Sequence, residues 1–247
     1  MTSQKKSKEA QTAGENVYQY LHTNIIQLQI KPGQTININE LSDFLKVSRS
    51  PIRDALVQLA RDGLVTTTPQ KSTIVSKINI PRAKDERFMR ACVEERILEE
   101  FLKCYEQTHI DALKDVLEQQ KQRMENKDIR GFLRTDDAFH SVFFQVTNHP
   151  FSLENILNMS SHYFRMRLLS LSALDICEQS YRQHQEILQL VLAKDYASIR
   201  EMINRHIVDK KDEEIRMERK FPDLFTGIEG ADYLKSKIWE DDFLMTI

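Results

Sequence analysis

The chain has 247 residues, of which 40% are hydrophobic and 29% charged, and its net charge is −2. This length allows two modest domains, each with its own core. No apolar run approaches the roughly 18 residues of a membrane-spanning helix, and the polar start lacks the apolar stretch of a signal peptide. We therefore expect a cytoplasmic protein whose three cysteines are free thiols.

The charge is distributed unevenly along the chain. Residues 1–78 hold ten lysines and arginines against six acidic residues, whereas the rest holds twenty-five against thirty-one. A basic front joined to an acidic body suggests that only the front binds a polyanion.

After a disordered polar tail at residues 1–14, residues 15–78 predict a small domain. Apolar residues at helical spacing predict three helices, with inward faces formed by Val17, Leu21, Ile25 and Leu28, then Leu41, Phe44 and Leu45, then Ile52, Leu56 and Leu59. Asn39 is the expected cap of the second helix and Ser48 that of the third, which Gly63 ends. Residues 64–68 and 73–78 are β-rich and predict a hairpin. This order is that of a winged helix-turn-helix.

The third helix carries the candidate DNA contacts. Arg49 and Arg53 lie four residues apart on one face, opposite the apolar residues, and Ser48 and Ser50 stand beside them. Arginine pairs bidentately with guanine or phosphate, and the N-terminal end of such a helix enters the major groove. The alternative is two solvated arginines beside an ordinary cap.

The segments IKPGQ, VSRSPIRDALVQLARDGLV and TTTPQKSTIV resemble the DNA-binding domain of the GntR family of bacterial transcription regulators. The resemblance implies that Arg49 and Arg53 contact DNA, supported by Ser48 and Ser50. It also implies that the wing tip, near Lys71 and Ser72, approaches the minor groove.

The remainder predicts a mainly α body. A linker at 79–84 precedes an all-helical bundle over residues 85–219, with six antiparallel helices at 83–106, 109–126, 129–147, 151–173, 177–193 and 196–219. Residues 220–247 form an extension whose role the pattern leaves open.

Three of these helices carry metal-competent side chains within apolar stripes. Asp136 and His140 interrupt one stripe, His184 a second and His206 a third. A lone inward histidine is usually a hydrogen-bonded core residue, and Asp136 with His140 could be a simple side-chain pair. Four such residues on three helices favour a metal site instead. Imidazoles with one carboxylate suit Zn²⁺, Ni²⁺, Fe²⁺ or Mn²⁺.

The segments VEERILEE, DDAFHSVFFQVTNHP and YRQHQEILQLVLAKDYASIREMINRHI resemble the FadR-type (FCD) ligand-binding domain of one GntR subfamily. The resemblance implies that Asp136, His140, His184 and His206 hold a metal ion, beside which a small carboxylate binds. It aligns Arg96 with a pocket arginine, although a salt bridge to Glu99 or Glu100 is the alternative. Arg165, near the buried-looking His162, is a second candidate for the pocket.

We therefore expect a homodimeric transcription repressor, not an enzyme, whose operator affinity depends on a small organic acid. Two alternatives remain at this point. One is a metal-free regulator that senses a larger acyl ligand, and the other is a metalloenzyme with a DNA-binding appendage.

Overall fold

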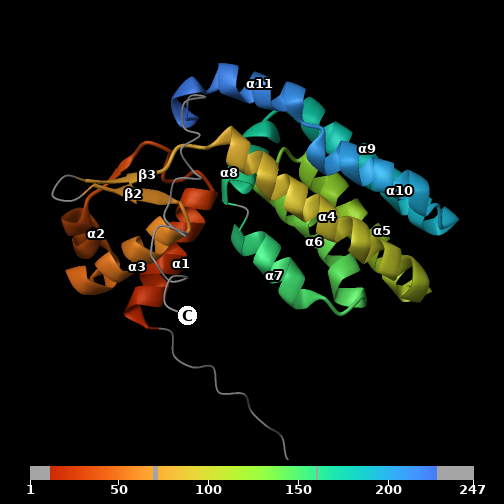
Figure 1. Cartoon of the computed structure of the whole chain (residues 1–247), viewed down its shortest axis with the longest axis horizontal. Helices are drawn as coiled ribbons and strands as arrows, with labels where there is room; N and C mark the ends of the chain where they lie inside the picture. The colour runs from red at the N-terminus through yellow and green to blue at the C-terminus, as the bar shows by residue number, and fades with distance from the viewer. Residues whose placement is uncertain (1–11, 69–71, 160, 227–247) are drawn as a thin grey trace, which may run out of the picture.

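The computed structural model describes residues 12–68, 72–159 and 161–226, and Figure 1 shows the strands with α1–α3 at one end and α4–α11 at the other. The predicted combination of a winged helix-turn-helix with a helical bundle is confirmed. No helix within the described part of the chain is long and apolar enough to cross a membrane.

The N-terminal unit contains the three predicted helices and a three-stranded antiparallel sheet of order β1-β3-β2. Its elements are α1 (Ala13–Ile26), β1 (Thr35–Ile36), α2 (Ile38–Leu45), α3 (Arg49–Arg61), β2 (Val65–Thr67) and β3 (Thr73–Val75). The sequence did not predict β1, because two residues are too few to show an alternating pattern. Gly63 takes a φ of 73° just after α3, as a helix-ending glycine does.

Three details of this unit differ from the prediction. Asn37, not Asn39, caps α2, accepting the backbone N–H of Asn39 at 2.9 Å. Phe44 is 68% exposed, so it does not face the core. Leu28 lies beyond the end of α1, with a φ of 57°.

The body contains more elements than the six predicted helices. They are α4 (Ile80–Cys104), α5 (Gln107–Glu125), α6 (Ile129–Val146), α7 (Pro150–Met159), α8 (Ser161–Ser170), α9 (Leu174–Ala193), α10 (Tyr196–Ile203), the π-helix η1 (Asn204–Val208), α11 (Lys211–Lys220) and the 3-10 helix η2 (Pro222–Leu224). The predicted helix 151–173 is divided into α7 and α8, and 196–219 into α10, η1 and α11.

The predicted linker at 79–84 is largely helical. Asn79 caps α4 through its side chain, and Pro81 lies in the first turn, where its missing N–H leaves no bond unmade. Residues 76–79 alone therefore separate β3 from α4, and they are called the linker below. The predicted start of the helix was too late because Pro81 was interpreted as a helix break.

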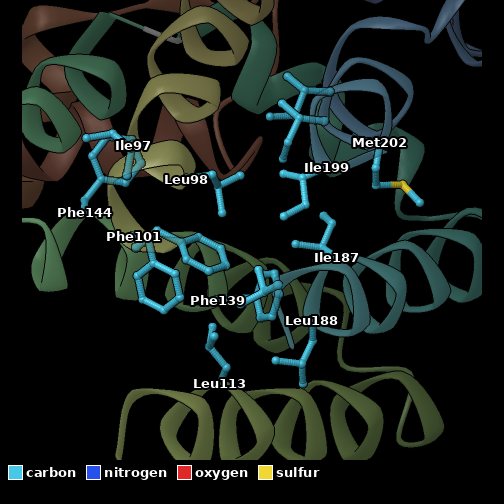
Figure 2. Packing of buried hydrophobic residues seen from close by; sticks show 14 of the residues in the cluster. Ile97, Leu98, Phe101, Leu113, Phe139, Phe144, Ile187, Leu188, Ile199 and Met202 are labelled. Carbon is cyan, nitrogen blue, oxygen red and sulfur yellow. The ribbon is translucent and has the colours of Figure 1, made fainter. Parts of the chain in front are cut away.

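A large apolar core joins α4, α5, α6, α9 and α10 (Figure 2). Phe101, Phe139 and Phe143 meet edge to face within it, and the ring of Phe139 stacks on that of His184 with centroids 4.5 Å apart. This apolar layer therefore covers one side of the inward-facing histidines and excludes water from it.

The first residues of the C-terminal extension return to the linker. The N–H of Ile78 donates to the carbonyl of Leu224 at 2.8 Å, and the N–H of Thr226 donates to the carbonyl of Ile78 at 2.9 Å. Phe221, Leu224 and Phe225 pack in a small cluster with Ile78. Residues 221–226 thus form a segment, here named the C-terminal strap, that fastens the end of the body to the linker.

Candidate metal centre and nucleic-acid interface

The predicted DNA contacts cluster at the start of α3. Ser48, Arg49, Ser50 and Arg53 are all exposed. Ser48 is at the N-cap position, but its side chain makes no capping hydrogen bond. The Ser48 side chain thus leaves the first backbone N–H groups of α3 available, and Arg49 and Arg53 lie beside them. This arrangement suits binding to phosphate groups or base edges.

The opposite face of α3 fixes this orientation. Ile52, Ala55, Leu56 and Leu59 are buried against α1 and the sheet. Ser72 lies at the start of β3, where its carbonyl accepts the N–H of Thr68 at 3.0 Å. Lys71, the other predicted wing contact, lies outside the described residues.

Three histidines converge in the body. His140 from α6, His184 from α9 and His206 from η1 are buried. The Nε2 atom of His206 lies 3.2 Å from that of His140 and 3.1 Å from that of His184. Ligand atoms bound at about 2.0–2.1 Å to one tetrahedral ion are separated by roughly 3.3 Å. These nitrogens are therefore spaced as ligands of one ion would be.

The outer nitrogen of each ring faces an oxygen. The Nδ1 atoms of His140, His184 and His206 lie, respectively, 2.6 Å from Glu94 Oε2, 2.8 Å from Gln120 Oε1 and 2.9 Å from Gln183 Oε1. The hydrogen bonds to Gln120 and Gln183 place the proton on Nδ1 of His184 and His206, and the Glu94 carboxylate favours the same tautomer of His140 by its proximity, so the Nε2 lone pairs point at one another. Converging lone pairs without a donor repel, and a cation between them removes that repulsion.

The charge state of the rings fits this interpretation. Burial lowers the pKa of His184 to about 3 and holds the pKa of His206 well below its usual value. The reason is that a protonated, charged ring would lack water to solvate it there. Both imidazoles are neutral at pH 7, which is the form that binds metal ions.

Asp136 lies beside the histidines rather than fully among them. Its carboxylate oxygens are 3.6 Å from His184 Nε2 and 3.9 Å from His140 Nε2, and one of them is paired with Arg167. Burial opposes ionisation of Asp136, but the charge of the adjacent Arg167 guanidinium outweighs it and holds the pKa of Asp136 well below its usual value. It is an ionised carboxylate close enough to act as a fourth ligand after a small side-chain shift.

The π-helix η1 sets the position of His206. Residues 204–208 form one wide turn between α10 and α11, and His206 and Ile207 are its buried members. Such turns are rare and recur at functional sites. A periodic hydropathy pattern cannot reveal the wider turn, which is why the sequence predicted one straight helix there.

A small cavity opens beside the histidines. It has a volume of about 40 Å³, and its lining includes Arg87, Asp136, Tyr163, Arg167, Ser170, His206, Lys210 and Glu213. A cavity needs about 10–15 Å³ on this scale for one water molecule, so this one holds a few waters. Three cations and two carboxylates line it, and its two arginines could bind an anion next to the histidines.

Neither predicted effector arginine reaches this cavity. Arg96 is exposed and pairs with Glu99 at 2.6 Å and Glu100 at 3.2 Å, which is the salt bridge that the sequence offered as the alternative. On α4 the inward positions are Arg87, Arg90 and Glu94.

Arg165 is buried but points toward the linker, where it donates to the carbonyl of Ser76 at 2.6 Å. It also contacts His162 Nδ1 at 3.1 Å. Arg167, two residues later on α8, faces the opposite side and lines the cavity. Arg87 and Arg167 were not predicted from the sequence. The pair Arg90 and Glu94, four residues apart on α4, could have indicated that this face of the helix is polar and buried.

Two family models match the chain. Residues 13–75 match the bacterial regulatory proteins of the gntR family, and residues 87–209 match the FCD domain. The two matches cover the winged-helix unit and the bundle with the three histidines, but end before α11 and the C-terminal strap.

The curated relatives are transcription regulators, not enzymes. The HTH-type transcriptional repressor RspR of Escherichia coli K12 is 26% identical over 84% of this chain and 91% of its own length. A regulator of Streptomyces ambofaciens, named for an unstable DNA locus, is 28% identical over 87% of this chain and 92% of its own.

Solved structures share the fold. The E. coli protein McbR/YncC superposes with a TM-score of 0.66 at 16% identity, covering 86% of this chain and all of its own. A GntR-type regulator from Rhodococcus sp. RHA1 gives a TM-score of 0.67 at 18% identity over 83% of this chain and 96% of its own.

Proposed function

The chain belongs to the GntR family of bacterial transcription regulators and carries an FCD domain, and from this premise we propose that it is a homodimeric repressor controlled by a metal-bound small acid. The observation that carries the proposal is the convergence of three buried imidazoles beside a small cavity that two arginines line. The family membership makes it a DNA-binding regulator, which acts where the chromosome is, in the cytoplasm.

We assign operator contact to the start of α3. Arg49 and Arg53, with Ser48 and Ser50, would enter the major groove, while Lys71 and Ser72 would carry the wing to the minor groove. The exposed guanidinium groups on a helix whose other face is fully buried support this assignment.

We assign the metal to His140, His184 and His206, with Asp136 as the fourth ligand. This donor set suits Zn²⁺, Ni²⁺, Fe²⁺ or Mn²⁺. The bound ion would supply a positive charge that attracts a carboxylate into the cavity. Glu94, Gln120 and Gln183 would hold the three rings in their binding orientation through Nδ1.

We assign effector binding to Arg87 and Arg167, in place of the arginines proposed from the sequence. Arg87 comes from α4 and Arg167 from α8, and both line the cavity next to Asp136 and His206. A volume of about 40 Å³ argues against a large acyl ligand and favours a small organic acid, which enters as neighbouring side chains move.

We assign dimerisation to the outer face of α4 and α7. Phe88 is 62% exposed and Phe151 75%, and Met89 and Met159 lie with them around one apolar groove. Apolar patches of this kind mark protein interfaces, and a second copy would cover this one symmetrically. The dimer would then place two α3 helices on a pseudo-palindromic operator.

Native mass spectrometry of untagged protein, purified without chelator, tests the proposal. We expect a dimer with one transition-metal ion per chain, and release of operator DNA when the effector acid is added. A reporter gene behind the operator should be repressed by the metal-loaded protein. A metal-free dimer that still binds its operator and responds to an acid would refute the metal assignment. A monomer would refute the assigned interface.

A further inference from the structure

One buried ion pair joins the cavity to α11. Arg87 and Glu214 are 2% and 3% exposed, and Nη2 of Arg87 donates to the Glu214 carboxylate. The Nε and Nη1 atoms of Arg87 are buried and have no hydrogen-bond partner within the described residues. A buried guanidinium with free donors is under-satisfied, so it can accept a second or a better anionic partner.

Side chains at the start of α11 also line the cavity. Lys210, one turn before Glu214, and Glu213, its direct neighbour, contribute to the lining. Because the cavity is too small for an organic acid as it stands, entry of an acid requires movement of the side chains that enclose it. Glu214, held by Arg87 and by Lys84 Nζ at 3.0 Å, is the anchor that resists such movement of α11.

The far end of α11 leads directly to the linker. Met217 is buried in the same cluster as Ile78 and Phe225, and the C-terminal strap follows at residue 221. The strap forms a parallel bridge to Ile78, which lies between β3 and α4. From the other side, Arg165 binds the carbonyl of Ser76, and His162 Nδ1 accepts the N–H of Asn79 at 3.0 Å. The linker is thus held between α8 and the strap.

We propose that Arg87 and Glu214 form an exchangeable pair that links the cavity to the winged-helix unit. The anion that enters the cavity replaces Glu214 on Arg87, α11 loosens, and the strap releases Ile78. The linker then gains freedom, and the spacing of the two α3 helices in the dimer changes. This device rests on the proposed function, in which the cavity takes an anion and the chain binds its operator as a dimer.

The exchange has a physical basis in its charge balance. One carboxylate replaces another on Arg87, so the guanidinium is never left without an anion. Glu214 keeps Lys84, whose side chain is 53% exposed, and can follow it into solvent. The incoming acid gains contacts to Arg167 and the metal centre that Glu214 does not make, and this difference in affinity drives the shift.

Hydrogen exchange on the full-length protein, without DNA or effector, tests the first half. In Glu214→Gln, which weakens the pair at nearly constant shape, we expect amides in residues 76–80 and 221–226 to exchange at least tenfold faster. Arg216→Gln is the matched control, because Arg216 on the same helix pairs with Asp175 at the surface, at 2.6 Å, and not with Arg87 or the cavity. Unchanged protection in Glu214→Gln would overturn the proposal.

Removal of a single backbone donor tests the second half. Thr226→Pro deletes the N–H that binds Ile78, and the extended backbone of Phe225, with a ψ of 151°, tolerates a following proline. Thr226→Ala keeps that N–H and is the control. We expect operator affinity to differ at least threefold between the two variants, at equal metal content. Equal affinities would overturn the role of the strap.

Neither comparison uses an effector, so failure of the effector assignment would be seen separately. That assignment is tested with succinate as probe. Succinate should speed hydrogen exchange in residues 221–226 of the metal-loaded wild type. In Glu214→Gln it should not speed this exchange further. Succinate that binds, by calorimetry, but leaves exchange in the wild type unchanged would overturn the exchange mechanism.

Discussion

The two domains of this regulator differ in what they bury. Apart from Thr73, every buried polar or charged side chain among the described residues lies between Glu86 and Glu214, in the helical body. The winged-helix unit buries aliphatic side chains and presents its arginines to solvent. The body also has an apolar core, but it buries histidines, arginines and carboxylates beside that core and leaves Phe88 and Phe151 outside.

The contrast follows from where each domain meets its ligand. DNA is large and is read from outside, so an ordinary apolar core suffices to orient α3. The small anion that we propose would be bound from inside, and each buried ionic group there costs solvation that must be recovered by pairing. Function in the first domain is therefore separable from stability, whereas in the second domain the two are coupled.

The largest effect should come from the metal centre. His206→Ala removes one of three converging nitrogens, and we expect it to lower metal affinity by more than the roughly 10–100-fold that loss of an outer partner costs. His149→Ala is the control, because this half-exposed ring pairs with Glu100 at 3.0 Å. Metal content by elemental mass spectrometry decides. Stoichiometric metal in the His206 variant would contradict the ligand assignment.

A change on the exposed side of α3 should separate binding from stability. Arg53→Ala should weaken operator binding by about 1–3 kcal/mol if Arg53 reads a base, with the thermal midpoint nearly unchanged. Arg61→Ala, at the far end of the same helix, should have little effect. Fluorescence anisotropy at fixed salt measures the operator affinity of both variants, and thermal unfolding gives their midpoints. Equal affinities would mean that Arg53 does not contact the operator.

The partners behind the histidines allow a finer test of the body. Gln183→Leu removes the oxygen that faces His206 Nδ1, so metal affinity should fall by roughly 10–100-fold. Gln185 is two residues away but exposed, and Gln185→Leu should leave the metal affinity as it is. Competition with a chromophoric chelator gives the metal affinity of each variant. Equal affinities would mean that Gln183 does not orient the ring.

The last effect concerns pH and leaves the metal centre and the operator contacts untouched. Burial, followed by the charge of Arg165, lowers the pKa of His162 to about 2. Below about pH 6.5 the unfolded chain binds a proton there that the folded chain refuses, so the free energy of unfolding falls as pH falls. His162→Asn should reduce this slope between pH 6 and 4 by about 1.4 kcal/mol per pH unit. Denaturant titrations measure it, and identical slopes would mean that His162 is protonated in the fold.

The sequence predicted the winged-helix unit well because its local signals agree. The inward aliphatic residues, the cap position of Ser48 and the glycine after α3 all describe the same helix, and each is a neighbour in sequence. The three histidines were also predictable, since each interrupts an apolar stripe on its own helix.

The register of α4 was not predictable, and the reason is physical. Phe88 and Met89 on this helix face outward, whereas Arg87 and Arg90 face inward, so the hydropathy pattern predicts the wrong face. Arg96 was assigned to the pocket on that basis. The strap was equally hidden, because a bridge between Ile78 and Phe225 depends on contacts across most of the chain.

That bridge also orders events during synthesis. The winged-helix unit ends at residue 75 and can fold as soon as it leaves the ribosome, because domains fold as units from the N-terminus. Its linker is held by the strap only after residue 226 has been made, on the order of ten seconds later at ordinary translation rates. During that interval the nascent chain carries the winged-helix unit on an unfastened linker, and for most of it the histidines at 184 and 206 have not yet been made. A regulator synthesised in this order completes its DNA-binding unit before the body that would control it.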